Sequence, residues 1–145
     1  MGTGRKVTSG NDIAILTIGH PGNFAQEAIA ELNTSGVSVA HYDMRFVKPI
    51  DELLLHEVFS KFKRVITIED GCLMGGFGSA VIEFMADQGY VAEITRLGIP
   101  DEYIHHGTQE ELWADCGFDK NAIVKTIKKM FSISTIEKNQ SEEAV

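Results

Sequence analysis

Four glycines between a short apolar run and an amphipathic segment form the part of this sequence best suited to chemistry. The stretch VITIEDGCLMGGFGSA, residues 65–80, places Gly71, Gly75, Gly76 and Gly78 where a strand would pass into a helix. Backbone amides at the start of a helix attract anions, and glycine lets a ligand approach that backbone closely. The spacing GxxxGGxG matches neither GxGxxG nor the phosphate loop, and no GK[ST] follows it. We therefore favour helix capping and close packing for this loop, and keep ligand contact as the alternative.

Charged residues are expected near this loop, because ligands of open α/β sheets bind beyond the carboxyl ends of the strands. Three loops should meet at that edge: residues 19–23, 43–48 and 69–78. Two cations there face three carboxylates: Arg45, Lys48, Asp43, Glu69 and Asp70. Since these charges nearly balance, we favour an ion-pair network between Arg45 and Glu69 that fixes adjacent loops over a substrate site.

Other reactive side chains give weaker signals. His105 and His106 are adjacent, so in an extended chain they point to opposite sides, and we expect no metal site there. No histidine is placed by the sequence to activate Cys72, which favours a structural thiol. The three aromatic residues after the fourth expected strand should pack the last two helices onto the sheet: Tyr103, Trp113 and Phe118.

Alternating strand and helix patterns must position these groups. The expected strands cover residues 13–18, 37–42, 65–68 and 92–97, and apolar residues at helical spacing lie between them. Thr108 with Glu111 predicts a capping box before a short helix, and Asp119 can cap a final helix that reaches Met130. The alternation predicts an α/β fold with three α/β/α layers, in which a mostly parallel sheet is covered by helices on both faces.

The bulk properties predict one domain. With 145 residues and 43% hydrophobic content the chain can build a single core. We expect residues 1–11 to be a disordered linker or an expression-derived start, 12–131 the domain, and 132–145 a polar, disordered tail. A net charge of −8 argues against nucleic-acid binding. The lack of a long apolar run argues against a membrane partner, and two cysteines without metal-ligand spacing favour a cytoplasmic location.

Three segments in order, DMRFVKPID, VITIEDGCLMGGFGSAVIE and RLGIPDEYIHHG, resemble the C-terminal domain of 1-deoxy-D-xylulose-5-phosphate synthase, a transketolase-like thiamine-diphosphate enzyme. The resemblance runs from about Asp12 to Ile127. It implies a transketolase C-terminal-domain-like fold, three-layer α/β/α with a mostly parallel (mixed) sheet of about five strands. It also implies a homodimeric enzyme that condenses pyruvate with glyceraldehyde 3-phosphate and releases carbon dioxide. That reaction feeds isoprenoid, thiamine and pyridoxal synthesis.

The same resemblance assigns the chemistry to other parts of the enzyme. The family's GDG motif with a downstream asparagine, its cofactor-activating glutamate and its substrate-phosphate groups belong to two preceding domains, and EDG at residues 69–71 is not GDG. The resemblance therefore implies no catalytic, cofactor-binding or metal residue in this chain, with thiamine diphosphate and Mg²⁺ held elsewhere in the full-length enzyme.

The family-motif positions that carry over are candidates for an interface or a loop network: Arg45, Lys48, Glu69, Gly75, Gly76, Gly78 and His106. The sequence departs from the family pattern at Asp70, where a second glutamate is common, and at His105, where an acidic residue is frequent. The implied partners are the remaining domains of the enzyme and a second copy. Two alternatives stay open: a stand-alone docking or regulatory domain related to keto-acid dehydrogenase β chains, and a small nucleotide-binding protein.

Overall fold

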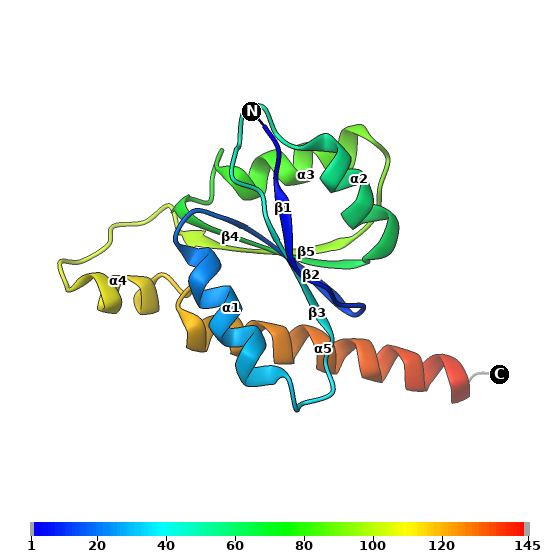
Figure 1. Ribbon diagram of the computed structural model, residues 1–145. Helices are drawn as coiled ribbons and strands as arrows, with labels where there is room; N and C mark the ends of the chain where they lie inside the picture. The colour runs from blue at the N-terminus through cyan, green and yellow to red at the C-terminus, as the bar shows by residue number, and fades with distance from the viewer. Residues whose placement is uncertain (1, 144–145) are drawn as a thin grey trace.

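Five strands form one mixed sheet in the computed structural model, which describes residues 2–143 apart from the side chains of 133–139 and 141–143. The strands are β1 (Arg5–Thr8), β2 (Ile13–Ile18), β3 (Val39–Asp43), β4 (Arg64–Cys72) and β5 (Glu93–Ile99). Their order across the sheet is β1-β3-β2-β4-β5 (Figure 1). Strands β2 to β5 run parallel, and β1 pairs antiparallel with β3.

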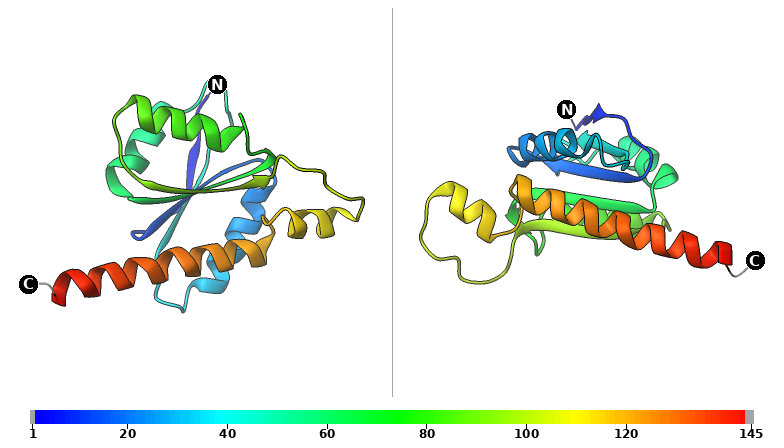
Figure 2. Two further views of the ribbon diagram at one scale, coloured as in Figure 1. Left: turned by 180° about the vertical axis from the view of Figure 1, so that it is seen from behind. Right: turned by 90° about the horizontal axis from the view of Figure 1, so that it is seen from below.

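Helices cover both faces of this sheet. They are α1 (Pro21–Leu32), α2 (Glu52–Lys61), α3 (Phe77–Asp87), α4 (Gln109–Asp115) and α5 (Lys120–Glu143). α1 and α5 lie on one face, α2 and α3 lie on the other, and α4 stands at one end of the molecule (Figure 2). The predicted three-layer α/β/α fold with a mostly parallel sheet is confirmed. Within the described residues no helix combines the length and the apolar character needed to cross a bilayer.

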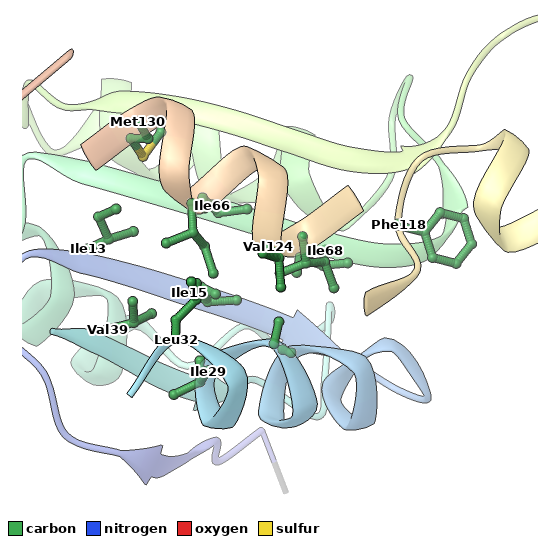
Figure 3. Close-up of a cluster of buried hydrophobic side chains, with 14 residues drawn as sticks. Ile13, Ile15, Ile29, Leu32, Val39, Ile66, Ile68, Phe118, Val124 and Met130 are labelled. Carbon is green, nitrogen blue, oxygen red and sulfur yellow. The ribbon is translucent and has the colours of Figure 1, made fainter. Parts of the chain in front are cut away.

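The core follows from the two-residue period of the strands, which sends alternate side chains to opposite faces. In β2, Ile13 and Ile15 join the apolar cluster under α1 and α5, drawn in Figure 3, whereas Ala14 and Leu16 join the cluster under α2 and α3. Full burial of one such Ile or Leu side chain contributes about 1.5–3 kcal/mol. The central strands are buried on both faces, which is why they read as nearly continuous apolar runs.

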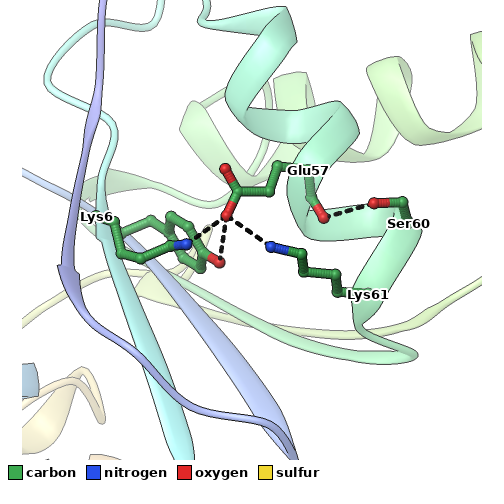
Figure 4. A network of polar contacts seen from close by, with 5 residues as sticks. Lys6, Glu57, Ser60 and Lys61 are labelled. Carbon is green, nitrogen blue, oxygen red and sulfur yellow. Dashed lines mark hydrogen bonds and ion pairs between the residues drawn. The ribbon is translucent and has the colours of Figure 1, made fainter.

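Strand β1 lies in the segment for which the sequence predicts a linker. Arg5 forms an ion pair with Asp43 at 3.1 Å. Lys6 forms an ion pair with the Glu57 carboxylate of α2 (Figure 4). The same carboxylate accepts hydrogen bonds from Tyr42 and Lys61. An edge strand needs backbone pairing and only a few side-chain contacts. The polar sequence RKVT therefore carries no alternating pattern that would predict it.

Helix α5 continues beyond the predicted end of the domain. It runs to Glu143, so its backbone is helical over residues 132–143 of the segment expected to be a disordered tail. Its first half is anchored in the core by Ile123, Ile127 and Met130. Residues 144–145 of that segment lie outside the described residues, and the domain boundaries at 12 and 131 stay a prediction.

Candidate functional site at the carboxyl edge of the sheet

The carboxyl ends of β2 and β4 form the topological switch point of this sheet. From the central strand β2 the chain passes through α1 to β3 on one side, and it later enters β4 on the other side. The helices that follow β2 and β4 lie on opposite faces, α1 on one and α3 on the other. Open α/β sheets bind ligands in the crevice at such a point.

The Glu69 carboxylate lies at the start of α3, where a helix N-terminus can bind an anion. Its side chain is 5% exposed. Oε2 accepts a hydrogen bond from the Phe77 amide at 2.7 Å, and Oε1 accepts one from the Gly78 amide at 2.9 Å. These amides would otherwise lack an intrahelical partner, and the helix dipole favours a negative charge beside them. The start of α3 thus binds an anion, and that anion is the carboxylate of the protein's own Glu69.

Two glycines of the loop make this contact possible. A Cβ at Gly76 would overlap the Cys72 carbonyl oxygen and the Glu69 carboxylate. A Cβ at Gly78 would lie 2.6 Å from the Thr67 hydroxyl oxygen. The prediction of close packing is wrong for Gly75, which has a positive φ of 71° and open space around it. The sequence prediction of helix capping and close packing therefore matches the geometry of Gly76 and Gly78.

A second set of hydrogen bonds, which the sequence does not predict, holds the tip of the glycine loop. Arg96 of β5 donates from Nη1 to the Leu73 carbonyl at 2.7 Å and to the Ser79 hydroxyl at 3.1 Å. Ser79 in turn donates to the Leu73 carbonyl at 2.9 Å and accepts from the Gly75 amide at 3.1 Å. The strand period could have pointed to Arg96, because it lies opposite Thr67 in the register and shares the face that α3 covers.

The predicted ion pair between Arg45 and Glu69 is wrong. Strand β2 lies between β3 and β4, so the loop after β3 does not adjoin Glu69. Arg45 is exposed at a positive φ of 62°, with its guanidinium 5.9 Å from the centre of the Phe46 ring. Lys48 is also exposed. Over residues 2–143, neither Arg45 nor Lys48 forms an ion pair with Glu69 in this structure.

The remaining sequence candidates do not converge on one point. His106 is exposed in the loop between β5 and α4, and the His105 ring packs edge-on to Tyr103 at 5.5 Å. Cys72 is exposed at the end of β4. In the described part of the chain, no group of three or more His, Cys, Asp or Glu side chains is placed to hold a metal ion. Interface roles for the family-motif residues stay a prediction.

A buried polar pair on the opposite face was not found from the sequence. The Thr17 hydroxyl lies 2.8 Å from Nε2 of His41, and both side chains are fully buried beneath Gly22 at the start of α1. Burial lowers the pKa of His41 to about 4, while Asp43 raises it and Arg5 lowers it. The imidazole is therefore neutral near pH 7 and closed to solvent, so it supports packing rather than proton transfer with a substrate.

The three aromatic residues after β5 have separate roles. Phe118 is buried in the core under α1 and α5, as predicted. Trp113 fixes α4 to the start of α1, since its ring stacks on His20 at 4.9 Å and meets Phe24 at 5.0 Å. Tyr103 is 77% exposed, so the prediction that it packs onto the sheet is wrong.

Comparison with known proteins adds a family match over most of the chain. Residues 2–123 match the family described as transketolase, C-terminal domain. The 1-deoxy-D-xylulose-5-phosphate synthase of Cytophaga hutchinsonii is 59% identical over 133 residues, covering 92% of this chain and 21% of that protein. The same enzyme of Bacteroides fragilis is 54% identical over 131 residues, covering 89% and 20%. The chain thus spans about a fifth of the length of these curated relatives.

Solved structures share the architecture. A split-gene transketolase, described as an inactive β4 tetramer, superposes with a TM-score of 0.82 and 28% identity, covering 90% of this chain and 43% of the other. Transketolase of Campylobacter jejuni superposes with a TM-score of 0.61 over 88% of this chain and 18% of the other, at 16% identity, which is a likeness of fold alone.

Proposed function

This chain belongs to the transketolase C-terminal domain family, and on that premise we propose that it works as the C-terminal domain of a 1-deoxy-D-xylulose-5-phosphate synthase. The whole enzyme would join pyruvate to glyceraldehyde 3-phosphate and release carbon dioxide. Support comes from synthases that are 59% and 54% identical over about nine tenths of this chain. Within that enzyme the domain has an architectural role, in which it stabilises a homodimer and shapes the surroundings of the active site.

The observation that carries this proposal is the Glu69 carboxylate at the start of α3. Thiamine diphosphate would need free amides or a cation for its phosphates. Here the Phe77 and Gly78 amides already bond to Glu69. A diphosphate would meet a negative charge where this fold most readily offers a positive one. The start of α3 therefore does not fit the cofactor, and we assign thiamine diphosphate and Mg²⁺ to the other domains of the enzyme.

Calorimetry tests the cofactor assignment directly. Thiamine diphosphate with Mg²⁺ is titrated into the 145-residue chain, and we expect no heat beyond dilution. The full-length Cytophaga hutchinsonii synthase serves as the control under the same conditions. Saturable binding near 1:1 to the short chain would contradict an architectural role.

A chimera tests the place of the domain in the enzyme. The segment of the Cytophaga hutchinsonii synthase that matches this chain is replaced by the chain itself, which is 59% identical there. We expect turnover of pyruvate and glyceraldehyde 3-phosphate within several-fold of the parent, because a domain that supplies contacts rather than reacting groups tolerates such an exchange. A folded chimera that binds thiamine diphosphate but neither dimerises nor turns over would contradict the proposal.

The solved neighbour supports self-association without catalysis. Its β chains are described as an inactive tetramer of a split-gene transketolase. By analogy, the isolated chain should pair with a second copy and lack synthase activity, which sedimentation velocity and an activity assay can check. The proposed compartment is the reducing cytoplasm, in line with Cys72 and Cys116, which are both free thiols.

A further inference from the structure

An apolar cavity lies between α4 and the end of the sheet. Its volume is about 280 Å³. The strand side contributes Asp70 and Ile99, and the α4 side contributes Ile104, Leu112 and Trp113. Taking about 30 Å³ for each water molecule, this space corresponds to roughly nine waters. It is the size of one small organic molecule.

The two sides of the cavity are anchored independently. On the strand side, Ile99 is paired with Cys72, and its carbonyl accepts the Leu73 amide at 2.9 Å. On the other side, the capping box of Thr108 and Glu111 fixes the first turn of α4. None of the residues of α4 is buried, and the helix with its preceding loop projects from the body of the molecule (Figure 1). The cavity persists because α4 is held away from the sheet edge instead of collapsing onto it.

The α4 side gains further support from the ring contacts of Trp113 with His20 and Phe24. These contacts tie α4 to α1, not to β5. Side chains from both sides of the gap between α4 and the end of β5, among them Ile99 and Leu112, line the cavity.

Carboxylates dominate the charge around this space. Asp70 lines the cavity, and among the described residues its lining includes no Lys or Arg. Asp115 and Glu102 lie close enough to act on the Cys116 thiol in the cavity wall. Burial first, and then the charges of Asp115, Asp70 and Glu102, raise the pKa of that thiol. Apolar walls with a negative rim suit an apolar body that carries a positive charge.

We propose that this cavity is a binding site for a small organic ammonium compound with a compact apolar body. The apolar part would lie against Ile99, Leu112 and Trp113, and the ammonium group would face Asp70 at the rim. The site is separate from the start of α3, where the Glu69 carboxylate is bound, and it does not depend on the proposed role in a synthase.

The test is an NMR titration of the full 145-residue chain with three probes of matched shape: benzylammonium, benzyl alcohol and benzoate. We expect saturable shifts of the Trp113 indole N–H and of the Ile99 and Leu112 amides. Benzylammonium should bind about fivefold more tightly than the alcohol, the gain expected of one partly exposed ion pair. Benzoate should bind more weakly than both. Equal affinities for the ammonium and the alcohol, or no saturable shift at Trp113, would overturn the proposal.

Two variants sharpen this titration. Asp70→Asn should remove most of the preference for benzylammonium over benzyl alcohol and leave the affinity for the alcohol unchanged. Asp87→Asn, at an exposed end of α3, is the matched control and should change neither affinity. Ile104→Trp fills the cavity from an irregular loop, so it should abolish binding of all three probes while the remaining amide signals stay in place. Unchanged binding in either Asp70→Asn or Ile104→Trp would show that the probes bind elsewhere.

Discussion

Glu69 does at the start of α3 what a bound anion does at other helix N-termini. Its two carboxylate oxygens satisfy two buried amides from a position in the preceding strand, whereas ordinary capping residues lie at the end of the helix itself. A strand side chain fixes the direction of the helix relative to the sheet as well as capping it. Loss of this carboxylate should therefore affect packing and capping together.

Glu69→Ala should lower the free energy of unfolding by about 2–4 kcal/mol, because two buried amides lose a charged acceptor. Urea unfolding monitored by circular dichroism measures the change. Asp70→Ala, one residue further along and exposed, is the matched control and should stay within about 0.5 kcal/mol of the parent. If the two variants are equally stable, the Glu69 bonds do not support α3.

His41 should make the stability depend on pH. Its pKa is about 4 in the folded chain and about 6.5 when unfolded, so between these values the unfolded chain binds more protons. The contribution is fully present above pH 6.5 and is lost as the pH falls towards 4, amounting to about 3 kcal/mol in total. The free energy of unfolding is measured at several pH values for the parent and for His41→Gln. The contribution of His41 appears as a difference between the two in the slope of this free energy against pH. An equal slope in His41→Gln and the parent would contradict this prediction.

At the scale of elements, the glycine loop combines two glycines with different physical roles. Gly76 has a φ of −85°, which any residue adopts, so its need for glycine comes from the close approach of Cys72 and Glu69. Gly75 has a φ of 71° and free space, so its need comes from the backbone alone. Alanine at each position separates the two effects.

Gly76→Ala should cost about 2–3 kcal/mol, because an added Cβ forces the loop away from the Glu69 carboxylate. Gly75→Ala should lower the free energy of unfolding by only about 1 kcal/mol, because alanine is disfavoured in a left-handed backbone conformation but the site has space for its Cβ. Chemical denaturation of both variants gives the comparison. An equal or smaller cost at Gly76 would mean that the loop relaxes without disturbing the contact between Glu69 and α3.

The elements that the sequence predicted are those whose hydrophobic pattern follows from burial. The apolar runs of β2 and β4 indicate the centre of the sheet, whereas β1 has the largely polar sequence RKVT and shows no apolar pattern that would predict it. The sequence predicts Arg45 as the partner of Glu69, but the structure pairs Glu69 with the Phe77 and Gly78 amides. Its place two residues after Thr67 puts it on the face covered by α3, whereas Arg45 follows a strand on the far side of β2. Which strands are neighbours depends on long-range pairing, and local spacing does not encode it.

At the scale of the whole molecule, the family-motif loops follow the carboxyl ends of β3, β4 and β5, and the proposed synthase would pack its other domains along that edge. The tip of the glycine loop carries Met74, 68% exposed although apolar. An exposed apolar side chain beside a rigid loop is suited to an interface core. Met130, by contrast, is buried in the core under α1 and α5, where it is only 3% exposed.

Oxidation by hydrogen peroxide can therefore show which surface the other domains of the proposed synthase would cover. In the isolated chain Met74 should convert to the sulfoxide much faster than Met130, because reaction requires access to the sulfur. In the Cytophaga hutchinsonii chimera the oxidation of Met74 should be at least several-fold slower than in the isolated chain. The oxidation of Met130 should be slow in both proteins, so Met130 serves as the internal control. Peptide mass spectrometry over time gives both rates from one sample. Equal rates for Met74 in the two proteins would place the interface on another face, and the glycine loop would then stabilise this domain without contacting its neighbours.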